Sequence, residues 1–246
     1  LSDERESTEN DEVFNWGKND FSPIKNKANI NEKSSRKSKI YITENYLLNE
    51  KETRRPKIQP GNRSYASATK YGKKVMVIGD SHIRRIRRDK FNNSIENAKS
   101  YVKGFEGAKV EHMKYHIIPM LKEQQPDIVI LHIGSNNISF KNLKINPLEI
   151  ATSIVEIAQQ CCSYNVNEII ISSITVKKSI RLTSIIREVN DALESLCLSR
   201  KFHFIRNDDI TPDHLTDGVH LNEYGTGILA SNFVDYINNY VFDNSY

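Results

Sequence analysis

The segment KVMVIGDS, residues 74–81, is an apolar run that stops at a glycine, an aspartate and a serine. An unbroken run of this length, bounded by turn residues, is typical of a strand that is buried on both faces of a parallel sheet. A basic stretch follows over residues 83–91, where the spacing of Ile83 and Ile86 predicts a helix with both isoleucines facing inward. The sequence therefore predicts a strand that delivers Ser81 to the start of a helix.

The same alternation of apolar runs and amphipathic stretches continues to the end of the chain. We predict further strands at 98–105, 127–134, 167–176 and 202–207, and further helices at 110–125, 147–164, 183–200 and 221–241. We expect the first of these helices to be interrupted near Pro119, whereas Pro147 and Asn222 suit the starts of two others. Strands that alternate with helices of this length predict βαβ units and a parallel sheet covered on both faces.

The first 73 residues differ from the rest in composition. The chain has 246 residues, of which 38% are hydrophobic, and residues 1–73 are rich in asparagine, serine, lysine and glutamate. Such a segment cannot bury enough apolar surface to offset its ordering entropy, so we predict a disordered tail at 1–73 and one folded domain at 74–246. The tail becomes basic toward its end, which suits either a solvated linker or an arm for RNA or an acidic partner.

Only indirect features bear on the cellular location. No apolar run is long enough to span a bilayer, and the three cysteines lack the spacing of a zinc site or a disulfide framework. The chain does not begin with methionine, so its true start is left open. The glycosylation sequon at residues 137–139 falls in a predicted functional loop, where a glycan would block function. We therefore expect a reducing location, in the cytoplasm or the nucleus.

Reactive and hydrogen-bonding residues follow the predicted strands at their carboxyl ends, where parallel sheets bind ligands. Ser81 follows the first strand, Gly107 the second and Asn136 the third, while Asp217 and His220 precede the last helix. A serine hydroxyl needs a base such as imidazole, and an aspartate three residues before a histidine can orient its ring. The N–H groups of Ser81 and Gly107 and the side-chain amide of Asn136 are suitable donors to an oxyanion.

These residues lie in blocks that resemble the four signatures of the SGNH (GDSL-like) hydrolases. The blocks are GDS at Ser81, the glycine of GFEGAKV at Gly107, GxN at Asn136, and DxxH at Asp217 and His220. The resemblance covers the predicted folded domain and implies a three-layer α/β/α fold with a parallel five-stranded, flavodoxin-like sheet. It also implies a cofactor-free serine esterase that acts on an acetyl, acyl or lipid-like ester through an acyl-enzyme. Ser81 would be the nucleophile, His220 the base and Asp217 its orienting partner, and Ser81, Gly107 and Asn136 would form the oxyanion hole.

Two positions depart from the family pattern. Asn137 stands where the third block usually has aspartate, and His82 stands where leucine often follows GDS. Asn137 can still accept a hydrogen bond through its carbonyl, so we expect an altered loop contact. We expect His132 to be structural and the adjacent pair Cys161 and Cys162 to be buried in their helix. More narrowly, the segments GDSHIRR and HIGSNN are similar to the esterase-type domain in first-open-reading-frame proteins of some animal non-LTR retrotransposons.

Two other interpretations use residues of the same segment. Asp80 and His82 match the Asp-x-His that opens many binuclear metal phosphoesterases, but the further histidine blocks of those enzymes are missing, so we expect no metal. Basic residues could form either a solvated face or a surface for RNA or an anionic substrate. These residues are Arg84, Arg85, Arg87, Arg88, Lys177 and Lys178. Because SGNH-like domains that have lost catalytic residues can bind RNA, the alternative function is a catalytically weak RNA-binding module.

Overall fold

The computed structural model describes residues 72–141 and 145–242, with side chains described up to residue 239. Most of the tail predicted at 1–73 lies outside the described residues, but Lys73 already belongs to the first strand. Within the described residues, no helix combines the length and the apolar character that crossing a bilayer requires.

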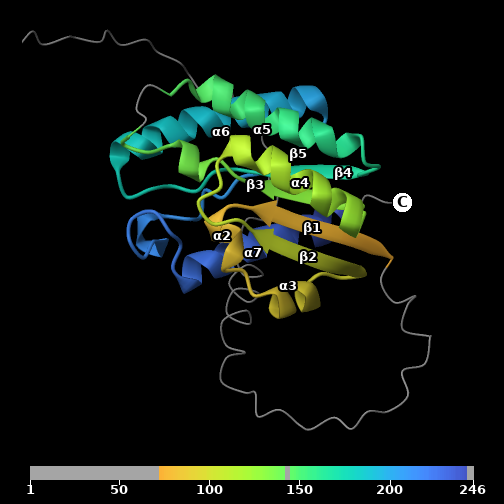
Figure 1. Cartoon of the computed structure of the whole chain (residues 1–246). Helices are drawn as coiled ribbons and strands as arrows, with labels where there is room; N and C mark the ends of the chain where they lie inside the picture. Colours follow the sequence, from red (N-terminus) through yellow and green to blue (C-terminus); the bar gives the residue numbers. More distant parts are fainter. Residues whose placement is uncertain (1–71, 142–144, 243–246) are drawn as a thin grey trace, which may run out of the picture. The chain divides into compact units, whose positions relative to one another are not determined.

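A parallel sheet of five strands forms the middle layer (Figure 1). The strands are β1 (Lys73–Gly79), β2 (Ala98–Gly104), β3 (Ile128–His132), β4 (Glu168–Ser172) and β5 (His203–Ile205). Their order is β2-β1-β3-β4-β5, and every neighbouring pair is parallel. This order is flavodoxin-like, so the prediction of a parallel five-stranded sheet of that type is confirmed.

Helices cover both faces of the sheet. They are α2 (Ser81–Arg84), α3 (Arg88–Ser94), α4 (Val110–Gln124), α5 (Pro147–Cys162), α6 (Ile180–Arg200) and α7 (Glu223–Tyr236), and a π-helical turn (Ile237–Phe242) follows α7. Short 3₁₀ turns lie at Ser135–Asn137 and Pro212–His214. Helices α5 and α6 lie on one side of the sheet, and α3 and α7 lie on the other (Figure 1).

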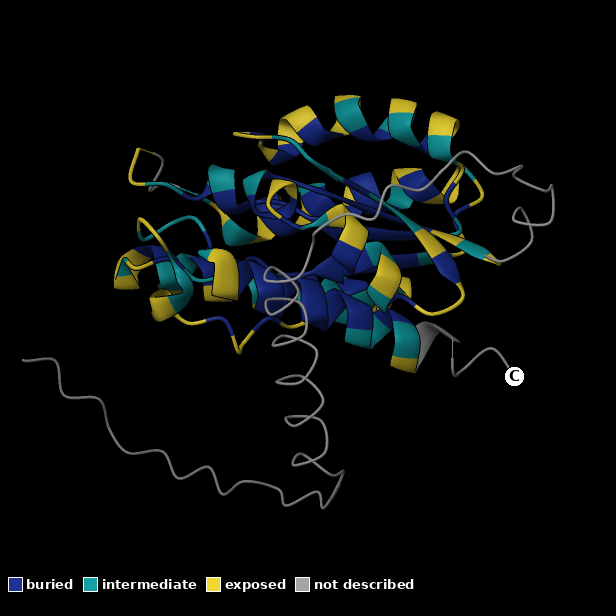
Figure 2. Ribbon diagram, turned by 90° about the horizontal axis from the view of Figure 1, so that it is seen from below, coloured by how far each residue is buried: buried dark blue, intermediate teal, exposed yellow. Residues whose placement is uncertain are grey.

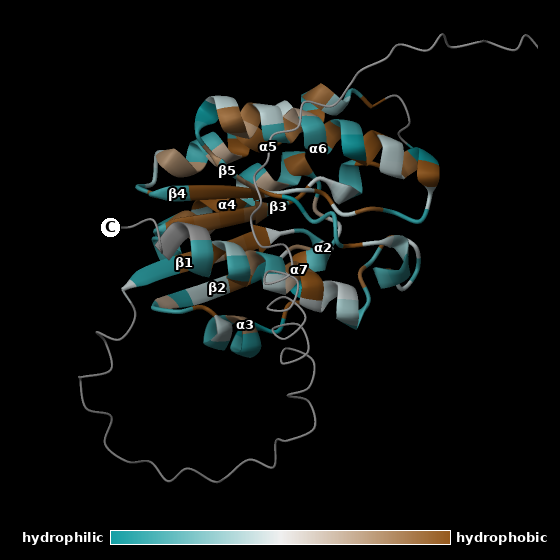
Figure 3. Cartoon of the chain, turned by 180° about the vertical axis from the view of Figure 1, so that it is seen from behind, coloured by the Kyte–Doolittle hydropathy of each residue, from teal (hydrophilic) through white to brown (hydrophobic). Residues whose placement is uncertain are grey.

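The alternation of side chains along β1 divides the core into two halves. Met76 and Ile78 pack in the core under α4, α5 and α6, whereas Val75 and Val77 pack with residues of α2, α3 and α7. Buried residues fill the sheet and the inner faces of the helices (Figure 2), and the central strands are hydrophobic (Figure 3). Both faces are therefore closed, and ligands can reach the sheet only at its ends.

Two helix predictions are wrong. The single helix expected over 83–91 is two short helices, because the N–H of Ile86 bonds back to Ile83 in a tight turn and Arg87 is extended. This break lets both isoleucines reach the core, as predicted. Helix α4 continues through Pro119, which is exposed, so water can satisfy the carbonyl that loses its backbone donor.

Other local predictions are confirmed. Pro147 begins α5 at its first turn, and Asn222 caps α7 by accepting a hydrogen bond from the N–H of Gly225 at 2.8 Å. Cys161 is buried as expected, but Cys162 is exposed because it lies on the outer face of α5.

The order of the strands determines where a ligand site can form. The connections from β1 and β3 leave in opposite directions and open a crevice at the carboxyl ends of these two strands.

Candidate active site

Ser81 is the first residue of α2, directly after β1, and it is half-buried. The carboxylate of the preceding Asp80 caps this helix by accepting a hydrogen bond from the N–H of His82 at 3.1 Å. The N–H of Asp80 donates to the carbonyl of His132 in β3 at 3.1 Å. Sheet and cap together fix the position of Ser81 at the carboxyl edge.

Gly107 and Asn136 lie in the loops that follow β2 and β3. Gly107 has a φ of +67°, a left-handed conformation that favours glycine, and it is exposed. The amide of Asn136 donates to the carbonyl of Ala108 at 2.9 Å, which ties the two loops together. One amide hydrogen of Asn136 is used in this contact, and among the described residues the other makes no hydrogen bond.

Asp217 and His220 form a hydrogen-bonded pair in the loop before α7. The Nδ1 of His220 lies 2.7 Å from Oδ2 of Asp217, and Oδ1 of Asp217 accepts from the backbone N–H groups of His220 and Val219 at 2.7 and 3.0 Å. The backbone and ring donors of His220 hold the pKa of the Asp217 carboxyl well below its usual range. The carboxylate therefore stays ionised and fixes the ring with Nε2 directed away from it.

Direct contacts bring the four blocks to one edge of the sheet. The N–H of Phe105 donates to the carbonyl of Gly79 at 2.8 Å, and His82 reaches the loop of His220 through the carbonyl of Val219. Among the described residues, no hydrogen bond joins Ser81 Oγ to His220. Ser81 and His220 therefore lie at the same edge of the sheet without a direct hydrogen bond between them.

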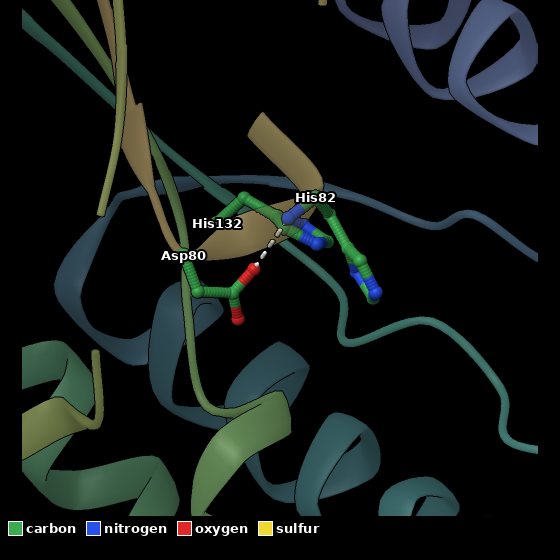
Figure 4. Close-up of side chains that lie close together, drawn as sticks. All are labelled: Asp80, His82 and His132. Atoms are coloured by element: carbon green, nitrogen blue, oxygen red, sulfur yellow. Dashed lines mark hydrogen bonds between the residues drawn. The ribbon is translucent and has the colours of Figure 1, made fainter. Parts of the chain in front are cut away.

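Asp80, His82 and His132 form a buried cluster (Figure 4). One ligand atom from each lies within 4.8 Å of the other two, so the histidine that the metal interpretation lacked is His132. We predicted a structural role for His132 and did not expect it beside Asp80 and His82, where the strand register that pairs Gly79 with His132 places it. Both ring nitrogens of His82 are engaged, however, with Val219 at 3.1 Å and with Thr175 at 3.2 Å.

His132 is also held by a side chain. Its Nδ1 lies 3.0 Å from Oγ of Ser172, and burial lowers its pKa to about 4. Burial also lowers the pKa of His82. Both imidazoles are therefore neutral near pH 7, the state in which each ring can donate one hydrogen bond and accept another.

We expected Lys177 to be one of the residues of an exposed basic surface, but it lies inside the domain. It is buried, with a relative exposure of 5%, and its ammonium donates to the carbonyls of Ser135 at 2.9 Å and Ile138 at 2.6 Å. Burial lowers its pKa, and the nearby carboxylate of Asp80 partly offsets this. The prediction of a surface role for Lys177 is wrong because its ammonium holds the loop of Asn136 from inside. Lys178 is exposed.

The arginines after Ser81 are exposed or half-buried, but three of the four make contacts within the domain. Arg84 pairs with Glu106, Arg85 donates to the carbonyl of Leu221 at 2.7 Å, and Arg87 lies 3.5 Å from Asp89. Arg88 is exposed at the start of α3. The nearby Lys90 is buried and so does not extend the basic surface.

A pocket of about 390 Å³ lies between α4 and α5. Its lining includes Asn137, whose amide oxygen accepts from the N–H of Val110 at 3.0 Å and whose NH₂ donates to Glu111 at 3.0 Å. Asn137 therefore accepts a hydrogen bond in the loop, as expected. Ser81 and His220 do not line this pocket, so it adjoins the candidate site without containing it.

Comparisons with known proteins establish the fold. No family model matches the chain, and no curated protein matches it. An acetylxylan esterase from Geobacillus stearothermophilus superposes with a TM-score of 0.58 at 18% identity, over 69% of this chain and 95% of that chain. A protein of the lipolytic G-D-S-L family from Veillonella parvula superposes with a TM-score of 0.57 at 22% identity, over 69% and 98%. At these identities the likeness shows the fold alone, and that fold is shared with solved ester hydrolases.

Proposed function

We propose that the chain is a serine ester hydrolase of the SGNH type, with Ser81 as nucleophile, His220 as base and Asp217 as its orienting partner. The observation that carries the proposal is the 2.7 Å pairing of His220 with Asp217 at the same edge of the sheet as Ser81. A base oriented by a carboxylate is what a serine hydroxyl requires. The N–H groups of Ser81 and Gly107 and the amide of Asn136 would stabilise the oxyanion.

The reaction would proceed in two steps. Oγ of Ser81 attacks the ester carbonyl while its proton passes to Nε2 of His220, and the tetrahedral oxyanion then collapses and expels the alcohol, which takes that proton. Water next gives a proton to His220 and attacks the acyl-serine, which releases the acid and restores the hydroxyl of Ser81. Asp217 stays ionised throughout and stabilises the imidazolium.

The structural comparison supports this assignment of roles. The acetylxylan esterase of Geobacillus stearothermophilus has catalytic mutants in which a serine, an aspartate or a histidine is replaced, and its aspartate and histidine are three positions apart. Asp217 and His220 have the same separation. Short acyl or acetyl esters are therefore the first substrates to test, and the narrower similarity to retrotransposon proteins stays a prediction.

Hydrolysis of p-nitrophenyl acetate and p-nitrophenyl butyrate by the purified chain tests the proposal. We expect turnover by the wild type and a loss of about 10³-fold or more in Ser81→Ala and in His220→Gln. Both variants should keep the thermal midpoint of the wild type, because neither side chain is buried. Equal turnover by Ser81→Ala and wild type would contradict the proposal.

The alternative, an RNA-binding module, stays a prediction that the same preparations can test. Binding through basic side chains weakens steeply as salt rises, so a salt-dependent shift of single-stranded RNA is its signature. Such binding by Ser81→Ala at wild-type strength would show that RNA binding and ester hydrolysis are separate properties. No binding at low salt would exclude it.

A further inference from the structure

The segment that carries His220 is anchored through its backbone carbonyls. Four consecutive carbonyls, those of residues 218–221, each accept a hydrogen bond. Two of the donors are backbone groups: the N–H of Lys178 bonds to Gly218 at 2.9 Å, and the N–H of Thr216 bonds to His220 at 2.8 Å. The other two donors are side chains, and both come from the first turn after Ser81.

His82 is the first of these side chains. It directly follows Ser81 and is 1% exposed, and its Nε2 lies 3.1 Å from the carbonyl of Val219. A carbonyl can only accept, so Nε2 carries the proton and Nδ1 accepts from the hydroxyl of Thr175. The ring also meets the ring of His220 edge-on, with centroids 6.2 Å apart and an interplanar angle of 89°. The leucine common at this position in the family could make neither hydrogen bond.

Arg85 is the second side-chain donor. It follows the last residue of α2, and its guanidinium donates to the carbonyl of Leu221 at 2.7 Å. Leu221 directly follows His220 in the chain, and Val219 directly precedes it. A charged donor to a partly buried carbonyl makes a stronger hydrogen bond than a neutral donor.

From these contacts we infer that His82 and Arg85 are positioning residues that clamp the carbonyls of the two residues flanking His220 to the helix that begins with Ser81. The inference rests on the proposed function and extends it, because it explains how a base with an exposed partner carboxylate is held at the same edge of the sheet as Ser81. Asp217 sets the rotation of the His220 ring, whereas the clamp sets the distance of its backbone from α2. Part of the basic segment after Ser81 thereby acquires an intramolecular role in place of a nucleic-acid surface.

Hydrogen exchange and steady-state kinetics on the full chain together test the clamp. The variants are His82→Leu, which removes the donor, His82→Gln, whose amide can replace it, and Arg85→Met. Arg88→Met is the matched control, since Arg88 is an exposed arginine of the same segment and, among the described residues, makes no hydrogen bond or ion pair with residues 216–222. Amide exchange of the peptide 216–222 reports the clamp without any requirement for activity, and p-nitrophenyl acetate hydrolysis reports its effect on the base.

We expect His82→Leu and Arg85→Met to speed exchange in 216–222 and to lower kcat about tenfold each, with KM changed less than about twofold. His82→Gln should recover most of both losses, and Arg88→Met should match the wild type. Unchanged exchange in Arg85→Met, or faster exchange with unchanged kcat, would overturn the inference. If the wild type hydrolyses no ester, the proposed function fails, while the exchange data still decide whether the clamp exists.

Discussion

At the scale of single residues, the side chains that support the site are as informative as those proposed to react. Lys177 is buried, and its ammonium donates hydrogen bonds to the carbonyls of Ser135 and Ile138. These two residues flank Asn136 and Asn137. Removal of a buried donor leaves its acceptors unsatisfied, which costs more than the hydrogen bond itself contributes. The loop that presents Asn136 therefore depends on a lysine from the connection after β4.

Replacement of this lysine should weaken both the fold and the reaction. We expect Lys177→Met to lower the free energy of unfolding by about 2 kcal/mol and kcat by about tenfold, because methionine fills the space without donating. Urea unfolding and p-nitrophenyl acetate hydrolysis measure the two effects. The exposed neighbour gives the control, and Lys178→Met should behave like the wild type. Similar behaviour of the two variants would argue against the support assigned to Lys177.

Asn137 offers a second test at this scale. Its NH₂ donates to the carboxylate of Glu111 at 3.0 Å, and the aspartate usual at this position in SGNH hydrolases would instead place two carboxylates in contact. We expect Asn137→Asp to cost about 1 kcal/mol of stability, and to cost almost nothing when Glu111→Gln is also present. A double-mutant cycle by urea unfolding measures the coupling. Equal costs in both backgrounds would show that Glu111 is not the reason for asparagine here.

At the scale of elements, the close approach of α2 to β2 fixes Ser81. A Cβ atom added to Gly104 would lie 2.2 Å from the N of Arg84 and 2.7 Å from the carbonyl oxygen of Asp80, and both of these are backbone atoms. Neither can move without displacing the helix that begins at Ser81. Glycine at the end of β2 is thus a packing requirement of the site.

The corresponding prediction is that Gly104→Ala destabilises the domain. Overpacking of this kind costs about 1–3 kcal/mol, which corresponds to a fall of roughly 5 °C in the thermal midpoint. Gly72→Ala is the control, because the nearest atom to its added Cβ is 3.9 Å away. Calorimetry of both variants measures the difference, and equal midpoints would contradict the close approach.

The sequence predicts these elements well where the signal is local and poorly where it is not. Strand runs, the cap at Asn222 and the positions of Ser81 and His220 depend on residues close together in the chain. The contact of His82 with Val219 joins residues 137 positions apart, and the contact of Lys177 with Ser135 joins residues 42 apart. No periodicity or motif encodes such pairs, which is why the burial of Lys177 was not predicted.

At the scale of the whole molecule, the five strands and their helices form two closed cores, so the described residues contain what an independent domain requires. We propose that residues 72–246 fold without the segment that precedes them. This fragment should unfold in one cooperative transition at a midpoint within about 2 °C of that of the full chain, and it should hydrolyse esters equally well. Calorimetry of the two proteins checks this, and a broad or much lower transition of the fragment would show that the preceding residues contribute to the fold.

The most direct test of the central claim is covalent labelling of the full chain with a fluorophosphonate, followed by mass spectrometry of the digested adduct. A serine activated by an oriented imidazole attacks phosphorus, whereas an ordinary serine does not react. We predict one adduct per chain, located on Ser81, absent from Ser81→Ala and strongly slowed in His220→Gln. A folded wild-type protein that stays unlabelled, or an adduct that persists in Ser81→Ala, would contradict the assignment of Ser81 as the nucleophile.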